Sequence, residues 1–453
     1  MTPFDYLAAH QDRSLRELIE FARIPSVSAD PMHRKDIAAA SEWVAARLRE
    51  AGPIEVRSMP IAGNPVVYGE WLGAPGRPTL LVYGHYDVQP AEPLDKWLSD
   101  PFQPEVRAGR LYGRGVSDNK GPLLIPIKVA QAFFVTRGAL PINIKFLFEG
   151  EEEIGSRNLA PCIAANTELL KADCVLSADG AMWRSDEPSI TIACRGVAAL
   201  EFSIRGANRN LHSGRYGGSV PNALHALAEL LAGLHSPDGR VAVEGFYDDL
   251  AALAEHEQAE IAALPFDEAR FLAELGASAA VGESGYSTLE RQWVRPTLEV
   301  NGMWGGFQGQ GSQTVTPNEA YAKISCRLVP DQRPDTIRAL VIRHLETHLP
   351  SGVGLSVSSE QHGALPYRIP SDHPGLKTAE RVLAEVYGTP PLRVRMGSTL
   401  PASELFKRTL AMDTVFFSFS TADEDFHSPN EFFRVSRLHE GLRAWARYWE
   451  CYA

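Results

Sequence analysis

The chain has few cysteines and no long apolar run, which argues against a disulfide-rich secreted protein and against a membrane protein. Its 453 residues include only five cysteines, which are scattered and form no C-x-x-C pair. They are Cys162, Cys174, Cys194, Cys326 and Cys451. This spacing excludes a disulfide scaffold and favours reduced, mostly buried thiols, so we expect the protein in the cytoplasm. No run approaches the roughly 20 apolar residues of a membrane span, so we expect no membrane partner.

Basic residues are outnumbered by acidic ones. The sequence has 44 Lys and Arg against 56 Asp and Glu, which gives a net charge of −12. Binding to nucleic acid or to an anionic membrane needs a basic stripe, so this balance argues against both partners. Residues 1–5 lack a basic segment followed by an apolar stretch, so we also expect no signal peptide.

The remaining composition is that of an ordinary globular protein. Hydrophobic residues make up 44% of the chain and charged residues 22%. A chain of 453 residues is too long for one compact core, so two or three domains are expected.

Strand-like and helical patterns alternate over the first 160 residues. Helical apolar spacing covers 12–22, 35–51 and 119–136, and strand-like runs cover 54–59, 65–72, 79–84 and 143–149. This alternation predicts an α/β fold with a sheet covered by helices on both faces. Ligands of such sheets collect at the carboxyl ends of the strands.

The pattern changes after Gly196. Residues 197–205 and 321–328 alternate like half-exposed strands, 221–234 and 334–349 read as helices, and 235–300 are acidic, Ala-rich and irregular. This middle region predicts an α+β insert. Helical spacing resumes at 373, a strand is expected at 413–417, and a last helix at 435–449.

Acidic residues and histidines lie where the expected strands end and turns begin. They are His85, Asp87, Asp118, Glu151, Glu152, Glu153, Asp179 and, far downstream, His427. Carboxylates and imidazoles are costly to bury without a partner. A divalent metal suits this mixture, and oxygen ligands combined with imidazole suit zinc, manganese or cobalt.

Each of these residues also has an ordinary interpretation when taken alone. Asp118 could cap a helix, the three glutamates could form a solvated face, and His427 could be a surface histidine. Three glutamates beside an apolar strand, however, need a cation, or one of them must hold a proton. One can bind metal while its neighbour acts as a general base. The order of the whole set, rather than any one member, favours a metal site.

Three motifs carry a resemblance to a known family. They are Tyr83-Gly84-His85-Tyr86-Asp87-Val88-Gln89-Pro90, Gly113-Arg114-Gly115-Val116-Ser117-Asp118-Asn119-Lys120-Gly121 and Arg327-Leu328-Val329-Pro330. Together with the acidic set, they resemble the co-catalytic di-zinc exopeptidases. That family includes carnosinase-like dipeptidases, carboxypeptidase G, aminoacylase, acetylornithine deacetylase and succinyl-diaminopimelate desuccinylase. The resemblance is greatest to the carnosinase-like dipeptidases.

The resemblance implies a fold and a division into domains. It implies a zinc-exopeptidase-like catalytic domain with a mixed sheet flanked by helices, and an inserted α+β lid that also forms a dimer. Because His427 belongs with the early acidic set, the catalytic domain must be discontinuous. We expect it to comprise residues 1–196 and 372–453, with 197–371 as the lid.

The resemblance also implies a role for each member of the metal set. His85 and Asp179 would hold one zinc, Glu153 and His427 would hold the other, and Asp118 would bridge the two. Manganese or cobalt could replace zinc. Asp87 would orient His85, Glu152 would be the general base and acid, and Glu151 would have no part in the chemistry.

In the insert, the resemblance implies residues that contact the substrate. His212 would reach into the site of the partner subunit of a homodimer. Arg327 would grip the substrate carboxylate, with Thr314 and the loop of Ser398 and Thr399 nearby. Without the metal set, these residues would read as a turn histidine, a sheet-edge arginine and a strand threonine.

Three functions remain open from the sequence. The leading one is a metallopeptidase that cleaves dipeptides or short peptides with a free C-terminal carboxylate. The second is a deacylase or carboxypeptidase for N-acyl amino acids, because Met396 stands where carnosinase-like dipeptidases often have an acidic residue. The third is an inactive metal- or peptide-binding protein, against which the intact Glu152 and the complete ligand set argue.

Overall fold

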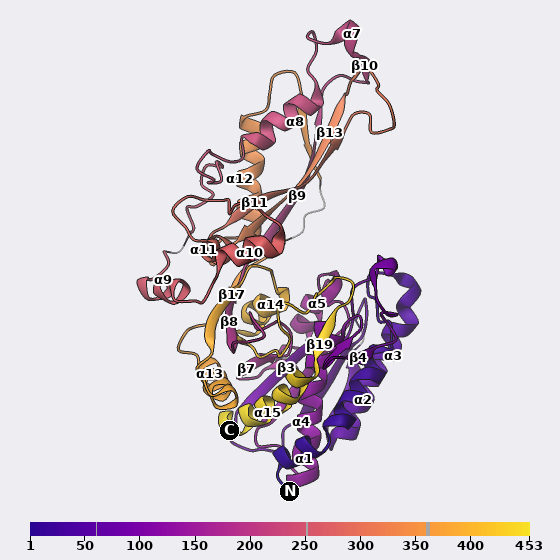
Figure 1. Cartoon of the computed structure of the whole chain (residues 1–453), viewed down its shortest axis with the longest axis vertical. Coiled ribbons are helices and arrows are strands. Elements are labelled where there is room, and N and C mark those ends of the chain that lie inside the picture. Colours follow the sequence, from indigo (N-terminus) through magenta and orange to yellow (C-terminus); the bar gives the residue numbers. More distant parts are fainter. Residues whose placement is uncertain (60, 251, 359–362) are drawn as a thin grey trace. The chain divides into compact units, whose positions relative to one another are not determined.

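The chain forms two compact units in the computed structural model, which describes residues 1–59, 61–250, 252–358 and 363–453 (Figure 1). The first unit comprises Met1–Ile192, Ile369–Val394 and Ala402–Ala453, and the second comprises Ala193–Arg368 and Arg395–Pro401. Residues 395–401 thus group with the second unit, apart from the segments on either side of them. The backbone N–H of Arg195 explains this, because it donates to the carbonyls of Met396 and Ser398.

A six-stranded mixed sheet forms the centre of the first unit. Its strands, in spatial order, are β1 (Glu55–Met59), β2 (Val66–Trp71), β6 (Asn143–Glu149), β3 (Thr79–His85), β7 (Cys174–Ser177) and β18 (Thr414–Phe416). The pairs β1–β2 and β2–β6 are antiparallel, and the pairs from β6 to β18 are parallel. Strands β6 and β7 are buried at every residue, which explains their continuous apolar runs.

Helices cover both faces of this sheet. They are α1 (Pro3–Ala9), α2 (Gln11–Ala22), α3 (Arg34–Ala51), α4 (Gly121–Arg137), α5 (Leu159–Ala165), α6 (Thr167–Leu170), α13 (Pro374–Tyr387), α14 (Pro401–Leu410) and α15 (Val435–Tyr452). Helix α4 contacts β3 on one face and is surrounded by α1, α2, α3 and α15. On the other face, Leu81 and Tyr83 of β3 share a core with Leu159 of α5 and Phe406 of α14.

A small sheet brings the C-terminal segment beside the 113–121 motif. Its strands, in order, are β19 (Phe432–Arg434), β5 (Arg110–Tyr112) and β4 (Glu105–Arg107). Strand β5 leads into the π-helical turn η3 (Val116–Lys120), and β19 follows the loop that carries His427. Other short turns are the 3-10 helices η1 (Pro31–His33), η2 (Leu94–Lys96) and η4 (Glu152–Ile154).

The second unit is built on an antiparallel sheet. Its order is β11 (Thr297–Gly305), β13 (Glu319–Leu328), β9 (Gly196–Arg205) and β14 (Gly354–Val357), and β15 (Gly363–Ala364) also pairs with β9. Buried residues alternate along β9 and β13, and they pack with α8 (Ala223–Ala232) and α12 (Pro334–Thr347). The same alternation leaves Arg327 on the face opposite these helices.

Further short elements complete the second unit and the junction. They are β10 (Leu211–His212), which pairs with β12 (Val315–Thr316), the helices α7 (Ser213–Tyr216), α9 (Glu255–Ala262), α10 (Glu268–Leu275) and α11 (Thr288–Trp293), and the sheet of β16 (Tyr367–Arg368), β8 (Ser189–Cys194) and β17 (Leu392–Met396). The chain passes between the units within β8, directly after β16, within β17 and after Pro401, the first residue of α14.

The predicted fold class, an α/β unit with an inserted α+β unit, is confirmed. The expectation that 235–300 would be irregular was wrong, because this region holds α9, α10, α11 and the start of β11. These helices have only six to eight residues, too few for a clear apolar period. Among the described residues, none of the helices combines the length and apolarity that a membrane crossing requires.

Candidate metal centre

The order of the central strands brings the predicted site residues to one edge of the sheet. His85 is the last residue of β3, and Asp179 follows the end of the neighbouring strand β7 by two residues. Glu152 and Glu153 follow β6, which pairs with β3 on its other side. Because β6, β3 and β7 run parallel, their carboxyl ends meet, and the side chains that follow them converge.

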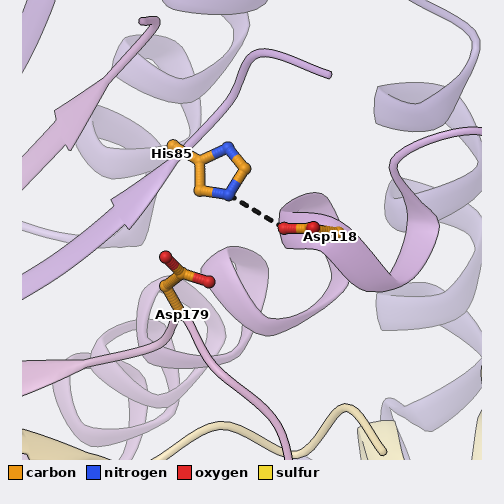
Figure 2. A group of neighbouring side chains, drawn as sticks. All are labelled: His85, Asp118 and Asp179. Carbon is orange, nitrogen blue, oxygen red and sulfur yellow. Dashed lines mark hydrogen bonds and ion pairs between the residues drawn. The ribbon is translucent and has the colours of Figure 1, made fainter. Parts of the chain in front are cut away.

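Asp118 lies between two histidines and points one carboxylate oxygen at each. Its Oδ1 is 3.0 Å from Nε2 of His85, and its Oδ2 is 3.1 Å from Nε2 of His427. The same nitrogen of His427 is 3.1 Å from Oε2 of Glu153. Figure 2 shows the ring of His85 directed at Asp118, with the carboxylate of Asp179 facing the same space. Five residues that are distant in sequence thus form one continuous cluster.

The cluster consists of two groups that could each hold a metal ion. His85, Asp118 and Asp179 form one group, and Asp118, Glu153 and His427 form the other. Within each group, the nearest ligand atoms lie within 4.8 Å of one another. Each group offers one imidazole nitrogen and two carboxylates, a set that suits zinc, manganese or cobalt. Asp118 is common to both groups.

Burial of several carboxylates in one place shifts their proton affinities. Burial raises the pKa of Glu152 well above its ordinary value, and the nearby carboxylates of Asp179 and Glu153 add to the rise. Burial likewise raises the pKa of Glu153 to about 7 and that of Asp179 to about 6. A bound cation would favour the charged form of each carboxylate and so act against these shifts.

The pKa of Asp118 shifts in the opposite direction, because this carboxylate contacts both histidines. Burial alone would raise the pKa of Asp118, but hydrogen bonds with His427 and His85 outweigh it and hold that pKa well below its usual range. Hydrogen bonds with Asp118 and Glu153 raise the pKa of His427 to about 10. Metal ligation needs neutral imidazoles, so an ion entering this cluster would displace protons from the histidines.

Asp87 connects two parts of the cluster. Its buried carboxylate has Oδ1 3.4 Å from Nδ1 of His85, on the side of the ring away from Asp118. The same carboxylate accepts the backbone N–H groups of Glu152 and Glu153, at 3.3 and 3.1 Å. The sequence predicted only its role toward His85. Asp87 therefore also anchors the turn that carries the two glutamates.

Two further residues around the cluster have roles that the sequence analysis missed. Gln89 donates from Nε2 to the carboxylate of Glu153 at 2.9 Å and to its carbonyl at 3.0 Å. In the sequence, the feature that could have identified Gln89 was its position four residues after His85. Glu151 is buried and accepts from the backbone N–H groups of Asn64 and Asn158, so it anchors two loops.

In the second unit, the structure brings Arg327 and Thr399 together. Nη1 of Arg327 donates to the Thr399 hydroxyl at 3.0 Å. The neighbouring Ser398 contributes its carbonyl to a 3.1 Å hydrogen bond from the N–H of Arg195, and its side chain is exposed. The guanidinium of Arg195 donates to the carbonyl of Gly397 at 2.9 Å. Two arginines thus hold the 397–399 loop.

His212 and Thr314 lie together at another place in the second unit. His212 pairs with Val315 across β10 and β12, and Ser213 N donates to the Thr314 carbonyl at 2.9 Å. Both adjoin the Glu319 end of β13, whereas Arg327 is near the opposite end of that strand (Figure 1). Arg327 lies eight positions after Glu319 along the strand, a span of roughly 26 Å. His212 and Arg327 of one chain are therefore far apart.

Known peptidases resemble this chain over most of its length. The family model described as peptidase family M20/M25/M40 matches residues 81–450. The Cys-Gly metallodipeptidase dug1 of Schizosaccharomyces pombe is 29% identical, over 98% of this chain and 96% of the relative. The Beta-Ala-His dipeptidase of Homo sapiens is 31% identical, over 98% of this chain and 91% of the relative.

Solved structures agree with the sequence comparisons. Human carnosine dipeptidase 1 has a TM-score of 0.84 at 30% identity, over 99% of this chain and 98% of that structure. The metallo-carboxypeptidase Sso-CP2 of Sulfolobus solfataricus has a TM-score of 0.86 at 30% identity, over 97% of this chain and 99% of that structure. The family resemblance predicted from the motifs is thereby confirmed. The chain belongs to peptidase family M20/M25/M40.

Proposed function

We propose that this protein is a metal-dependent dipeptidase. It would hydrolyse the amide bond of dipeptides or short peptides that carry a free C-terminal carboxylate. The single observation that carries the proposal is the sharing of Asp118 between two ligand groups, with Glu152 beside them on the turn η4. The names of two relatives, a Cys-Gly metallodipeptidase and a Beta-Ala-His dipeptidase, support the substrate class.

The metal centre would hold two divalent ions per chain, with zinc as the first choice and manganese or cobalt as alternatives. His85 and Asp179 would hold one ion, Glu153 and His427 the other, and Asp118 both. The donor set fits, because each group supplies one imidazole and two carboxylates within a short distance. Bound ions of this kind lower the pKa of water and polarise carbonyl groups.

Glu152 would move the proton in the reaction. Its backbone is held by Asp87 at 3.3 Å, so its side chain starts from a fixed point beside the ligands. It would take the proton of the attacking water and pass it to the leaving amine. His212 would supply a donor to the oxyanion of the tetrahedral intermediate.

The pair of Arg327 and Thr399 would bind the substrate carboxylate. A guanidinium offers a planar fork that matches a carboxylate in a bidentate geometry. One donor of Arg327 already meets the Thr399 hydroxyl, which fixes the orientation of the fork. Ser398 and Thr314 would make neighbouring contacts. A peptide without a free carboxylate would lose this anchor.

His212 would act on the substrate bound by the other subunit of a homodimer. Within one chain, roughly 26 Å of strand lies between the His212 end and the Arg327 end of β13, whereas a dipeptide spans only about 7 Å. Exposed apolar side chains on the edge strand β11, Val300 and Met303, offer a surface for a second copy. The cytoplasm remains the proposed location, in keeping with the five free cysteines.

Amidation of the substrate's C-terminus should weaken hydrolysis strongly. Removing the carboxylate leaves the buried part of Arg327 without its charged partner, so we expect a loss of about 2–4 kcal/mol in kcat/KM. The measurement compares dipeptides of the Ala-Ala type with their C-terminal amides under identical metal conditions. Equal kcat/KM values for the two forms would remove Arg327 from substrate binding.

Mixing two inactive variants should restore activity if the site is built from two chains. His212→Ala and Glu152→Ala homodimers should each be nearly inactive. After subunit exchange, a heterodimer has one site with an intact Glu152 that also receives an intact His212, so hydrolysis should reappear. Native mass spectrometry would verify the exchange. Proven heterodimers without activity would show that His212 does not act across the interface.

Hydrolysis of N-acyl amino acids is the second candidate function. Met396 is half-buried next to the 397–399 loop, and an apolar, flexible side chain there can pack against an acyl group but cannot neutralise an ammonium. One structural relative is named a metallo-carboxypeptidase. A panel of free and N-acetylated dipeptides with added zinc, manganese or cobalt separates the candidates. A loss above about a thousandfold on acetylation, roughly 4 kcal/mol, would show that the free amine is recognised. No turnover of any member would leave the binding-protein alternative.

A further inference from the structure

We propose that Glu431 is a positioning residue of the metal centre, a carboxylate that holds Asp118 and the His427 loop in one arrangement. The inference rests on the proposed function, since it concerns the affinity for the ions. Glu431 is fully buried and lies four residues after His427, directly before β19. Glu431 belongs to neither ligand group, and both of its carboxylate oxygens accept hydrogen bonds from N–H donors. Its hydrogen bonds define its role.

The side chain of Glu431 accepts four hydrogen bonds from one short segment. The donors are Nη1 of Arg114 at 2.8 Å and the backbone N–H groups of Gly115, Ser117 and Asp118 at 2.8, 3.0 and 3.1 Å. The carbonyl of Glu431 accepts a fifth, from Gly113 N at 3.0 Å. Every donor belongs to residues 113–118, the segment that ends at the shared ligand.

This arrangement fixes Asp118 from behind while its side chain faces the histidines. Asp118 must keep 3.0 and 3.1 Å contacts in two directions, so a small shift of its backbone disturbs both ligand groups at once. The loop that carries His427 ends at the same anchor, because Glu431 accepts hydrogen bonds from residues 113–118. The carboxylate of Glu431 thus fixes the positions of Asp118 and His427 relative to each other, although they are 309 residues apart in sequence. Polar groups behind metal ligands commonly orient them in this way.

If Glu431 served only to stabilise the fold, its replacement would lower the Tm without changing the affinity for metal. Its buried ion pair with Arg114 resembles that of Glu17 with Lys128, which joins α2 to α4 at 2.9 Å. Losing either pair leaves a buried charge unmatched and should lower the Tm. Of these two glutamates, Glu431 also accepts the backbone N–H of a proposed ligand, Asp118, whereas Glu17 contacts Lys128 and Arg13. Metal affinity therefore separates the two roles, because a structural pair such as Glu17–Lys128 should not influence it.

The test uses the full-length variants Glu431→Gln and Glu431→Asp, with Glu17→Gln as the matched control. Each protein is stripped of metal, checked for folding by circular dichroism, and titrated with Zn²⁺ in competition with a chromophoric chelator. We expect both Glu431 variants to bind at least one ion about 10–100-fold more weakly than the natural protein. Glu17→Gln should melt earlier and keep the natural affinity.

A second readout is the visible absorption spectrum of the Co²⁺-loaded proteins, which reports ligand geometry. We expect an altered spectrum for Glu431→Asp and an unaltered one for Glu17→Gln. Natural affinity and spectrum in both Glu431 variants would overturn the inference, as would the failure of both to fold without metal, which would assign Glu431 to the fold alone. If the unaltered protein takes up no ion, the proposed function itself fails.

Discussion

Replacement of Glu152 by glutamine should abolish turnover while leaving the ions in place. Gln keeps the size of the side chain but cannot accept the proton of the attacking water. Loss of a general base alone lowers kcat by about 10²–10⁴-fold, and poorer activation of the water adds to that. Glu152 belongs to neither ligand group, so metal content should remain near that of the unaltered protein. Stopped assays with a sensitive amine reagent and elemental analysis measure both quantities.

Glu151→Gln is the matched control for this experiment. Glu151 is adjacent and buried, but it accepts hydrogen bonds from the backbones of Asn64 and Asn158 rather than facing the ligands. We expect it to lower stability more than kcat. A nearly normal kcat in Glu152→Gln together with an inactive Glu151→Gln would show that the proton is moved by the first of the three glutamates, contrary to our account.

Replacement of Asp118 by alanine should remove both ions, whereas replacement of Glu153 should remove one. The difference follows from geometry, because Asp118 belongs to both ligand groups and Glu153 to one. Without Asp118, the two groups lose their common carboxylate and His85 and His427 lose contacts of 3.0 and 3.1 Å. We expect activity to fall to the background rate in Asp118→Ala.

Elemental analysis after dialysis gives the stoichiometry of each variant. We expect two ions per chain in the unaltered protein, one in Glu153→Ala and none in Asp118→Ala. Thermal melting of each metal-free protein serves as the control, since a folded variant is needed to interpret the count. Equal metal content in the Glu153 and Asp118 variants would contradict the sharing of Asp118.

Much of the first unit could be predicted from the sequence because its central strands are apolar on both faces. The expected strand 143–149 coincides with β6, and 79–84 differs from β3 by one residue. Since polar residues directly follow these runs, the convergence of His85, Glu153 and Asp179 at one sheet edge was also predictable. The physical cause is the parallel pairing of β6, β3 and β7.

The environment of Asp118 could not be predicted from local sequence. An aspartate before an expected helix reads as an N-cap, yet α4 begins at Gly121 without a side-chain cap, and the carboxylate of Asp118 faces two histidines. The N–H of Asp118 is bound by Glu431, a residue 313 positions later. No local period or motif encodes a hydrogen bond over that distance.

In the second unit, the sequence predicted the half-buried strands but not the strand that is largely without buried residues. Strands β9 and β13 alternate clearly between buried and partly exposed residues. Edge strand β11 does not, because only Leu298 is buried and its other residues are exposed or half-buried. An edge strand without a buried face lacks the alternation of apolar and polar residues from which a strand is predicted. The contact between Arg327 and Thr399, 72 residues apart, was available only through the family resemblance.

We propose that peptide hydrolysis by this protein depends on metal ions that the residues around Asp118 would hold. The most direct measurement is the hydrolysis of an Ala-Ala-type dipeptide by metal-stripped protein as Zn²⁺ is added in known amounts. We expect no turnover without metal and full activity when two ions per chain have been bound. Full turnover by extensively stripped protein that contains no metal would contradict this proposal.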